Sequence, residues 1–248
     1  MTAALRSALH ALWCLFWVIP TAFWMMAATP FANGHQMFSY AKFFLARAMH
    51  GLRVICGVNW QVEGMENLPN GPAILLVKHQ STLETFLMPL LMPRDLAYVF
   101  KKELLYVPFF GWGIARCDMI HIDRSRRNEA FAKVVAQGQR LLDKGVWVIM
   151  FPEGTRIPRG KAGTYKTGGT RLAIATNTPV VPIAVNSALC WPRKAFVKKP
   201  GMVTISIGKP IDAAGREADE LMQEVQAWIE AEVRRLDPAA FDPAALAT

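Results

Sequence analysis

The segment AILLVKHQSTLETF, residues 73–86, joins an apolar run directly to a group of reactive side chains. Residues 73–77 are apolar and rich in branched side chains, which predicts a buried strand. His79 follows almost at once, and two hydroxyls and the carboxylate of Glu84 come next. Open α/β folds place their ligands at the carboxyl ends of the strands. The segment therefore predicts an α/β sheet with a functional site at its rim.

The rest of the chain repeats this alternation from about residue 58 onward. Short apolar runs and helix-compatible stretches predict one α/β domain over residues 56–236, with a central, mostly parallel or mixed sheet covered by helices. The expected strands are 59–62, 73–77, 97–100, 119–122, 146–151, 180–185 and 203–207. The expected helices are 82–91, 128–143, 169–176 and 218–236. Residues 237–248, with two prolines, are expected to form a loosely ordered tail.

The amino-terminal region, residues 1–55, is expected to form membrane-anchoring helices. No Asp, Glu, Lys or Arg lies between Arg6 and Lys42, and aromatic side chains are frequent there. Pro20 and Pro30 each remove a helical hydrogen bond, which favours a monotopic hairpin. A single spanning helix and a cleaved signal peptide are the alternatives. Residues 35–53 are expected to form a basic amphipathic helix that lies either at the membrane interface or against the domain.

Composition narrows the choice of partners. Of the 248 residues 52% are hydrophobic, and the net charge is +9, which favours nucleic acid, an acidic bilayer or a phosphorylated metabolite. Because the first 41 residues are so apolar, a phospholipid membrane is the expected partner and nucleic acid is not. The four cysteines are widely spaced in no disulfide or metal-binding pattern, so we expect a reducing compartment, buried thiols and no metal.

Two interpretations of His79 and Glu84 remain open. In the structural one, Ser81 begins the next helix and Glu84, at its third position, completes a capping box, so that the histidine is incidental. In the chemical one, Glu84 accepts a hydrogen bond from one imidazole nitrogen, and the other nitrogen takes a proton from a substrate hydroxyl. Residues five apart in a helix differ by about 140° around its axis, so His79 has to lie in the turn before the helix.

A second candidate site is FPEGTR, residues 151–156, at the end of another expected strand. Pro152 and Gly154 favour a turn there. The side chains that this turn places at the rim are those of Glu153, Thr155 and Arg156. A guanidinium, a hydroxyl and free backbone amides suit a phosphate group. A solvated basic loop is the alternative.

A third candidate element is MIHIDRSRR, residues 119–127. Its arginines, among them Arg124, either contact phosphate or headgroups or form the solvated start of a helix. His121 alternates with two isoleucines, so we expect it on one face of a strand in a structural role.

Together these motifs identify a family. His79 with an acid five positions later, Ile-Asp-Arg at 122–124, FPEGTR at 151–156 and Val-Val-Pro-Ile at 180–183 occur in the order and spacing of a known set. Over about residues 60–210 the chain resembles the glycerolipid acyltransferases, specifically the bacterial 1-acyl-sn-glycerol-3-phosphate acyltransferases. The resemblance implies transfer of a fatty acyl group from an acyl thioester, on acyl carrier protein or coenzyme A, to the sn-2 hydroxyl of lysophosphatidic acid. The product would be phosphatidic acid.

The resemblance also implies roles for single residues. His79 would be the general base and Glu84 its orienting partner. The residues implied to bind the substrate phosphate are Lys102, Arg124, Phe151, Pro152, Glu153, Gly154, Thr155 and Arg156. Val181 and Pro182 would line the acyl or donor site. No cofactor is implied beyond the thioester co-substrate, and the expected location is the cytoplasmic face of the bacterial inner membrane.

Two departures and three alternatives accompany this assignment. The family usually has aspartate where this chain has Glu84, and many members have glycine at Asp118. Ser81 lies close enough to His79 in sequence that a covalent Ser-His route has to be tested. Another lysophospholipid or an acylated amino-acid lipid could replace the acceptor. A non-enzymatic protein that binds anionic lipid is the alternative from another class.

Overall fold

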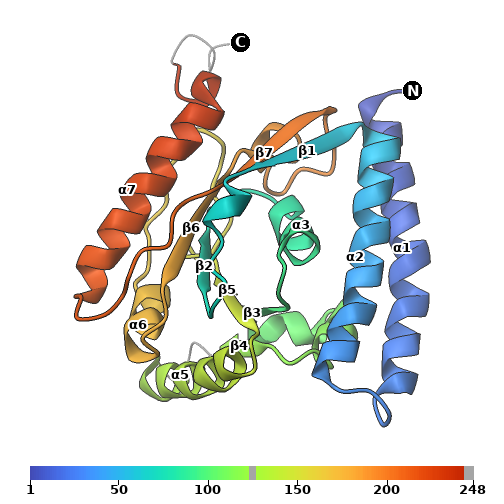
Figure 1. Cartoon of the computed structure of the whole chain (residues 1–248). Coiled ribbons are helices and arrows are strands. Elements are labelled where there is room, and N and C mark those ends of the chain that lie inside the picture. The colour runs from blue at the N-terminus through green and yellow to red at the C-terminus, as the bar shows by residue number, and fades with distance from the viewer. Residues whose placement is uncertain (123–126, 243–248) are drawn as a thin grey trace.

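The computed structural model describes residues 1–122 and 127–242, and it describes residues 127–130 by their backbone alone. Two helices, α1 (Ala3–Ala28) and α2 (Gly34–Cys56), form an antiparallel hairpin along one side of an α/β domain (Figure 1). The strands are β1 (Val58–Glu63), β2 (Ile74–Val77), β3 (Leu96–Lys101), β4 (Ile120–Ile122), β5 (Trp147–Met150), β6 (Val180–Val185) and β7 (Gly201–Ile207). The remaining α-helices are α3 (Leu83–Leu91), α4 (Phe110–Ile114), α5 (Arg127–Asp143), α6 (Gly168–Ala175) and α7 (Ala218–Leu236). Short 3-10 turns are η1 (Met65–Asn67), η2 (Lys102–Tyr106), η3 (Ser187–Leu189) and η4 (Pro238–Ala240).

The strands that the structure describes form one mixed sheet in the order β1-β7-β6-β2-β5-β3-β4. Neighbouring strands are parallel except β6 and β7, so β1 and β7 run opposite to the other five. The carboxyl ends of β2, β3, β4, β5 and β6 therefore lie at one edge of the sheet, which we call the carboxyl edge. The predicted α/β class with a mixed sheet is confirmed.

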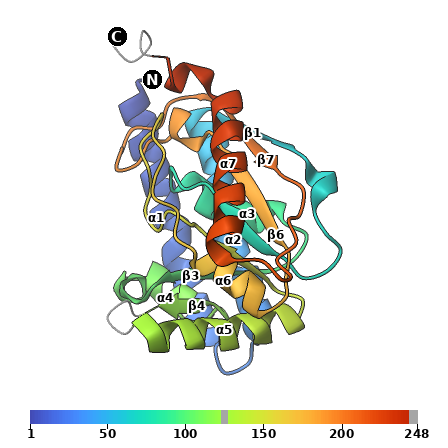
Figure 2. The same cartoon turned by 90° about the vertical axis from the view of Figure 1, so that its left-hand side faces the viewer.

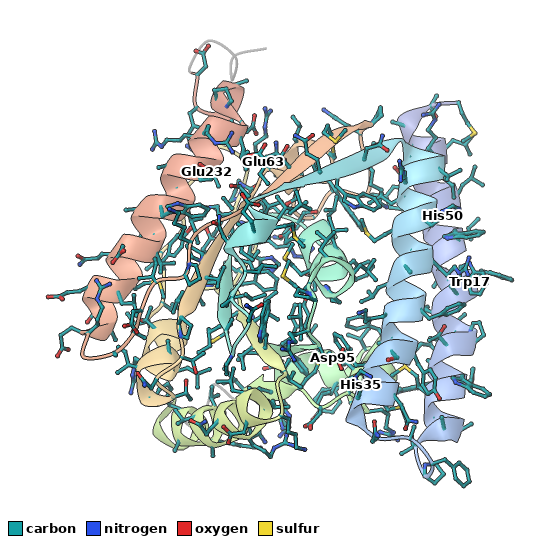
Figure 3. All side chains as sticks on the ribbon, in the orientation of Figure 1. Trp17, His35, His50, Glu63, Asp95 and Glu232 are labelled. Carbon is teal, nitrogen blue, oxygen red and sulfur yellow. The ribbon has the colours of Figure 1, made fainter. Side chains whose placement is uncertain are left out.

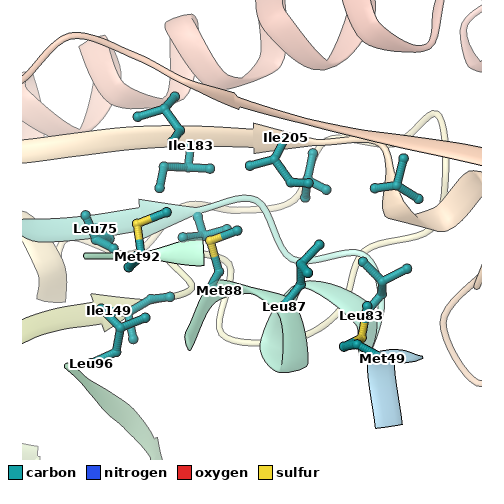
Figure 4. Packing of buried hydrophobic residues seen from close by; sticks show 14 of the residues in the cluster. Met49, Leu75, Leu83, Leu87, Met88, Met92, Leu96, Ile149, Ile183 and Ile205 are labelled. Carbon is teal, nitrogen blue, oxygen red and sulfur yellow. The ribbon is translucent and has the colours of Figure 1, made fainter. Parts of the chain in front are cut away.

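Each face of the sheet has its own hydrophobic core. On one face, α3 and α2 pack against side chains from β2, β5, β6 and β7; Figure 4 shows Leu87 and Met88 of α3 turned toward Leu75, Ile183 and Ile205. On the other face, α5, α6 and α7 cover Ile74, Leu76 and their neighbours. The two views in Figures 1 and 2 show α7 and the α1–α2 hairpin on opposite sides of the sheet. Alternation along each strand sends successive side chains into these two cores.

The helical hairpin turns near Pro30 and not at Pro20. α1 continues through Pro20, so this proline does not interrupt the helix. The chain reverses after α1, and a capping box begins α2: the Asn33 side chain accepts from the Gln36 amide, and the Gln36 side chain accepts from the Asn33 amide.

α2 packs against the domain, which is one of the two positions expected for residues 35–53. Phe38, Met49 and Leu52 on α2 are buried in the same core as the sheet. The outer face of α1 remains exposed: Phe16 is 66%, Phe23 54% and Trp24 59% accessible. In Figure 3 the side chain of Trp17 points away from the sheet. In the part of the chain that the structure describes, α1 is the one helix long and apolar enough to cross a membrane.

The carboxyl-terminal segment is packed farther than expected. Asp237 is buried and accepts two hydrogen bonds of 2.7 Å from Arg159. Ala240 is also buried, so the loose tail predicted from residue 237 is wrong for residues 237–240. Residues 243–248 lie outside the described residues. The four cysteines are free thiols, and burial raises the pKa of Cys117 to about 12.

Candidate active site

The imidazole of His79 lies at the carboxyl edge, in the turn between β2 and α3. Its Nδ1 is 2.9 Å from Oε1 of Glu84. The Glu84 side chain is fully buried, whereas that of His79 is 14% accessible. The pair seen in the sequence therefore meets in space, with the histidine before the helix as its five-residue spacing requires.

The carboxylate of Glu84 also organises the turn. Its Oε1 accepts hydrogen bonds of 2.7 Å from the backbone N–H groups of Gln80 and Ser81. Its Oε2 accepts one of 2.7 Å from the hydroxyl of Ser187, which comes from η3. The two interpretations of Glu84 are thus compatible, because one carboxylate both holds the start of the helix and contacts the imidazole.

The predicted capping box is only half formed. Thr82 is the residue that precedes α3, and the Ser81 hydroxyl accepts from the Leu83 amide at 3.1 Å. The expected helix start at residue 82 is therefore one residue early, because the Glu84 side chain turns back to the amides before the helix.

The ring of His79 is held on one face by Phe151. The two rings stack with centroids 3.9 Å apart and planes 15° from parallel. Since a carboxylate only accepts hydrogen bonds, the proton between His79 and Glu84 belongs to Nδ1. Among the residues that the structure describes, Nε2 makes no hydrogen bond, so its lone pair is available to a substrate proton.

The FPEGTR turn packs directly on His79. Gly154 has φ +65°, a left-handed conformation that glycine adopts without strain, and its amide donates to the Phe151 carbonyl at 2.9 Å. The Ile157 amide donates to the carbonyl of His79 at 2.8 Å. Thr155 and Arg156 are exposed, and Arg156 donates to the Thr82 hydroxyl at 2.9 Å. These two side chains therefore remain at the rim beside the imidazole.

Glu153 points away from the rim. Its Oε1 accepts from the ammonium of Lys78 at 2.6 Å, and its Oε2 accepts from the backbone amide of His79 at 2.9 Å. Burial raises the pKa of Glu153, and the nearby Lys78 opposes that shift. A buried carboxylate engaged in this way does not face a substrate phosphate. The expected phosphate-binding role is corrected to one of positioning the backbone of His79.

The ammonium group that binds Glu153 belongs to Lys78, the residue that directly precedes His79. Lys78 is fully buried and also donates to Oε1 of Glu230, on α7, at 2.6 Å. The Tyr165 hydroxyl donates to the same oxygen at 2.8 Å. One buried network therefore links α7, the loop before α6 and the turn that carries His79.

The remaining predicted residues are scattered. Lys102 is exposed at the start of η2. Burial lowers the pKa of His121, and the charges of Lys133 and Lys102 add to that shift. Arg124 lies outside the described residues. Val181 and Pro182 are both buried on β6, and as neighbours on a strand they point to opposite faces of the sheet. Their side chains are part of the buried sheet, and the expected role at the acyl or donor site stays a prediction.

Sequence reasoning missed three polar residues of this region. Lys78 follows an apolar strand and could have been noticed, because a lysine that continues such a run needs a buried partner. Ser187 and Glu230 carry no comparable signal. Their roles depend on long-range packing of η3 and α7 against the turn.

The chain matches known proteins over most of its length. The family model described as Acyltransferase matches residues 59–186. The chain is 43% identical over 189 residues to the 1-acyl-sn-glycerol-3-phosphate acyltransferase of Pseudomonas aeruginosa, covering 75% of this chain and 73% of that protein. It is 31% identical to the protein of the same name from Saccharomyces cerevisiae, covering 82% and 69%.

A solved structure resembles the fold described above. It is the crystal structure of the 1-acyl-sn-glycerophosphate (LPA) acyltransferase PlsC from Thermotoga maritima. The TM-score is 0.77 at 24% sequence identity, with 95% of this chain and 98% of that chain covered. The likeness extends over the helical hairpin as well as the sheet, since so little of either chain is left out.

Proposed function

Because this chain belongs to the acyltransferase family, we propose that its carboxyl edge transfers a fatty acyl group from an acyl thioester to the sn-2 hydroxyl of 1-acyl-sn-glycerol-3-phosphate. The product is phosphatidic acid, for phospholipid synthesis. The observation that carries the proposal is the imidazole of His79, whose Nδ1 is held by buried Glu84 while Nε2 is left unpaired among the described residues. Acyl carrier protein or coenzyme A carries the donor acyl group.

The reaction follows from this geometry. As the sn-2 oxygen attacks the thioester carbonyl carbon, its proton moves to Nε2 of His79. Glu84 stabilises the imidazolium that forms, because its carboxylate accepts the Nδ1 proton in a hydrogen bond. Collapse of the tetrahedral intermediate breaks the carbon–sulfur bond, and the proton passes from Nε2 to the departing sulfur. Holding both substrates at this site supplies the rest of the rate enhancement.

The acceptor phosphate is proposed to bind beside the imidazole. Arg156 offers a planar set of donors and Thr155 a hydroxyl, both at the rim. The backbone of residues 151–156 provides the other contacts. Arg124, from the sequence, and Lys102 are proposed to add positive charge. Glu153 is left out of the substrate contacts because it is buried.

The hairpin is proposed to lie in the plane of the membrane as a monotopic anchor. α2 packs against the domain from Phe38 to Cys56, so the domain runs beside the hairpin over nearly its whole length. A perpendicular α1 would draw the polar surface of the domain into the hydrocarbon, which is costly. An in-plane hairpin buries only the apolar outer face of α1. The location proposed is the cytoplasmic face of the bacterial inner membrane, where acyl thioesters are found.

The test is acyl transfer by the purified, detergent-solubilised protein. Acyl carrier protein and coenzyme A thioesters are each supplied with lysophosphatidic acid, and with lysolipids that lack a terminal phosphate. His79→Ala is expected to abolish product, whereas His50→Ala, at an exposed histidine on α2, is expected to keep it. Ser81→Ala is expected to retain turnover, because no acyl-enzyme is needed.

Each outcome assigns a function. Phosphatidic acid formed by wild type and not by His79→Ala supports the proposal and identifies the donor. Transfer only to a lysolipid without a terminal phosphate would move the activity to a different acceptor. Binding of anionic lipid with no transfer to any acceptor would refute the enzyme and leave a lipid-binding protein.

A further inference from the structure

The segment between β3 and β4, residues 102–116, exposes an unusual amount of apolar surface. Tyr106 is 73% accessible, Val107 42%, Leu104 41% and Trp112 38%. These residues come from η2, the following loop and α4. A contiguous apolar surface of this kind on a protein marks a site of interaction with a partner or a membrane.

This segment is joined to the exposed face of α1. The rings of Phe23 and Phe109 lie 6.0 Å apart, and Nε of Arg116 donates to the Thr29 hydroxyl at 3.0 Å. Figures 1 and 2 both show α4 beside the carboxyl-terminal end of α1. The neighbouring exposed side chains are Phe23 and Trp24 of α1 and Phe31 in the turn that follows it. The exposed face of α1 and the segment 102–116 therefore meet at Phe23 and Phe109.

The backbone of the segment is built to present these rings. Phe109 has φ +61° and ψ −57°, and the Phe110 amide donates to the Pro108 carbonyl at 2.7 Å. That tight three-residue turn is a rare, strained conformation for a residue with a side chain. It places the ring of Phe109 between Phe23 of α1 and Trp112, whose ring centroid lies 5.0 Å away.

The same segment borders the candidate active site. It leaves β3 at the carboxyl edge, where β5, the parallel neighbour of β3, delivers Phe151. Phe151 stacks on His79, and the ring of Tyr98 on β3 lies 6.1 Å from it. The apolar surface and the imidazole therefore belong to the same edge of the sheet.

Charge points to one occupant. Lys101, Lys102 and Arg116 flank the apolar side chains, and Glu103 is the one acidic residue of residues 101–116, so the segment carries a net positive charge. Aromatic rings bordered by cations match the interface of an anionic bilayer. We propose that residues 102–116 form a second lipid-facing surface, which inserts Tyr106, Val107 and Trp112 into an anionic phospholipid bilayer beside α1. The carboxyl edge around His79 then faces the membrane, a consequence that rests on the proposed function.

A depth measurement tests the contact itself. The full chain carrying Tyr106→Cys, in a Cys14→Ala background because the other native thiols are buried, is labelled with an environment-sensitive fluorophore. It is reconstituted in vesicles of phosphatidylethanolamine and phosphatidylglycerol that contain nitroxide-labelled lipid. The matched control is Met65→Cys, since Met65 is 42% accessible and follows β1 at the opposite edge of the sheet. The fluorescence emission of the label at 106 is expected to shift to the blue and to be quenched by the nitroxide-labelled lipid. The emission of the label at 65 is expected to show neither change.

The same emission wavelength and the same quenching for the two labels would overturn the proposal. This readout needs no turnover, so it judges the surface even if the proposed reaction fails. Quenching at 106 that requires phosphatidylglycerol supports the role of the flanking cations. Quenching at both positions would indicate that the whole domain is submerged, which also contradicts the proposal.

A kinetic split tests the consequence. Tyr106→Asp combined with Trp112→Asp is expected to lower turnover of vesicle-embedded lysophosphatidic acid about tenfold, because two interfacial apolar contacts are lost. Turnover of a short-chain, water-soluble lysophosphatidic acid is expected to be unchanged. Met65→Asp is the control for a charge placed elsewhere. An equal loss on both substrates would show that the segment supports the fold of the site and would reject the lipid contact.

Discussion

The hydroxyl of Ser187 donates a 2.7 Å hydrogen bond to Oε2 of Glu84, although the two residues are 103 positions apart. Ser187→Ala removes the one donor to that oxygen among the described residues. A lost hydrogen bond to a charged group is worth about 1.5–3 kcal/mol, so kcat is expected to fall at least about tenfold with KM little changed. Ser187→Thr is expected to restore part of the loss. Ser206→Ala, which removes a buried serine that donates to Glu232 away from the site, is the control and should leave kcat intact.

Glu84→Gln separates the two roles of this side chain. Glutamine retains an oxygen that accepts from the amides of Gln80 and Ser81, so the melting temperature is expected to stay close to that of wild type. The negative charge that supports the imidazolium is lost, and kcat is expected to fall about a hundredfold or more. Steady-state kinetics beside thermal unfolding measures both quantities. Full activity in the variant would leave Glu84 with a structural role alone.

Lys78→Met tests the buried network behind His79. The substitution leaves the carboxylates of Glu153 and Glu230 without their shared cation, and breaking a buried pair in this way costs about 3–5 kcal/mol of unfolding free energy. Adding Glu153→Gln is expected to recover part of that loss, because one uncompensated charge is removed. Lys166→Met, at an exposed lysine, is the control. A Lys78 variant as stable as this control would show that the network contributes nothing.

Asp118 and Arg140 predict a small dependence of stability on pH. Hydrogen bonds from Arg140 lower the pKa of Asp118. A carboxyl whose folded-state pKa is depressed stabilises the fold above its unfolded pKa of about 3.9, and that contribution disappears as pH falls through the lower folded value. The pair is more than a third accessible, so the contribution is within about 1 kcal/mol. The melting temperature of Asp118→Asn should be below that of wild type at neutral pH, and the difference should shrink as the pH falls below the unfolded pKa of about 3.9. A difference that stays constant with pH would contradict this.

Gly160 is expected to tolerate no side chain. Its φ is +74°, and a Cβ there would lie 2.2 Å from the carbonyl oxygen of Ala240. Gly215 also has a positive φ, +66°, but its Cβ would meet nothing within 4 Å. Gly215→Ala is therefore expected to cost about 1–2 kcal/mol for the left-handed backbone alone, and Gly160→Ala distinctly more. Denaturant unfolding of both variants measures the difference, and equal losses would exclude a packed η4.

Local patterns predicted the sheet and the reactive pair. Each strand that the structure describes overlaps an expected one, because buried strands need unbroken apolar runs and the turns between them are marked by glycine and proline. The five-residue spacing placed His79 before the helix, and its contact with Glu84 followed. These inferences depend on residues close together in sequence.

The errors arose where distant segments decide the outcome. Pro20 left the course of α1 open, and its lost hydrogen bond is tolerated in a helix that packs along α2. Glu153 looked like a rim residue until Lys78 and the His79 amide gave its carboxylate buried partners. Asp237 was assigned to a loose tail because nothing nearby in sequence shows that Arg159 holds it.

The way α2 is packed limits how this protein can be handled. Phe38, Met49, Leu52 and Cys56 complete the same hydrophobic core that fills the space between α3 and the sheet. A shortened protein that begins at β1 would leave that core open to water on one side. Removing the first 56 residues would therefore favour solubility and at the same time destabilise the fold. A form of the protein that needs no detergent has to keep α2 and change only the exposed apolar face of α1.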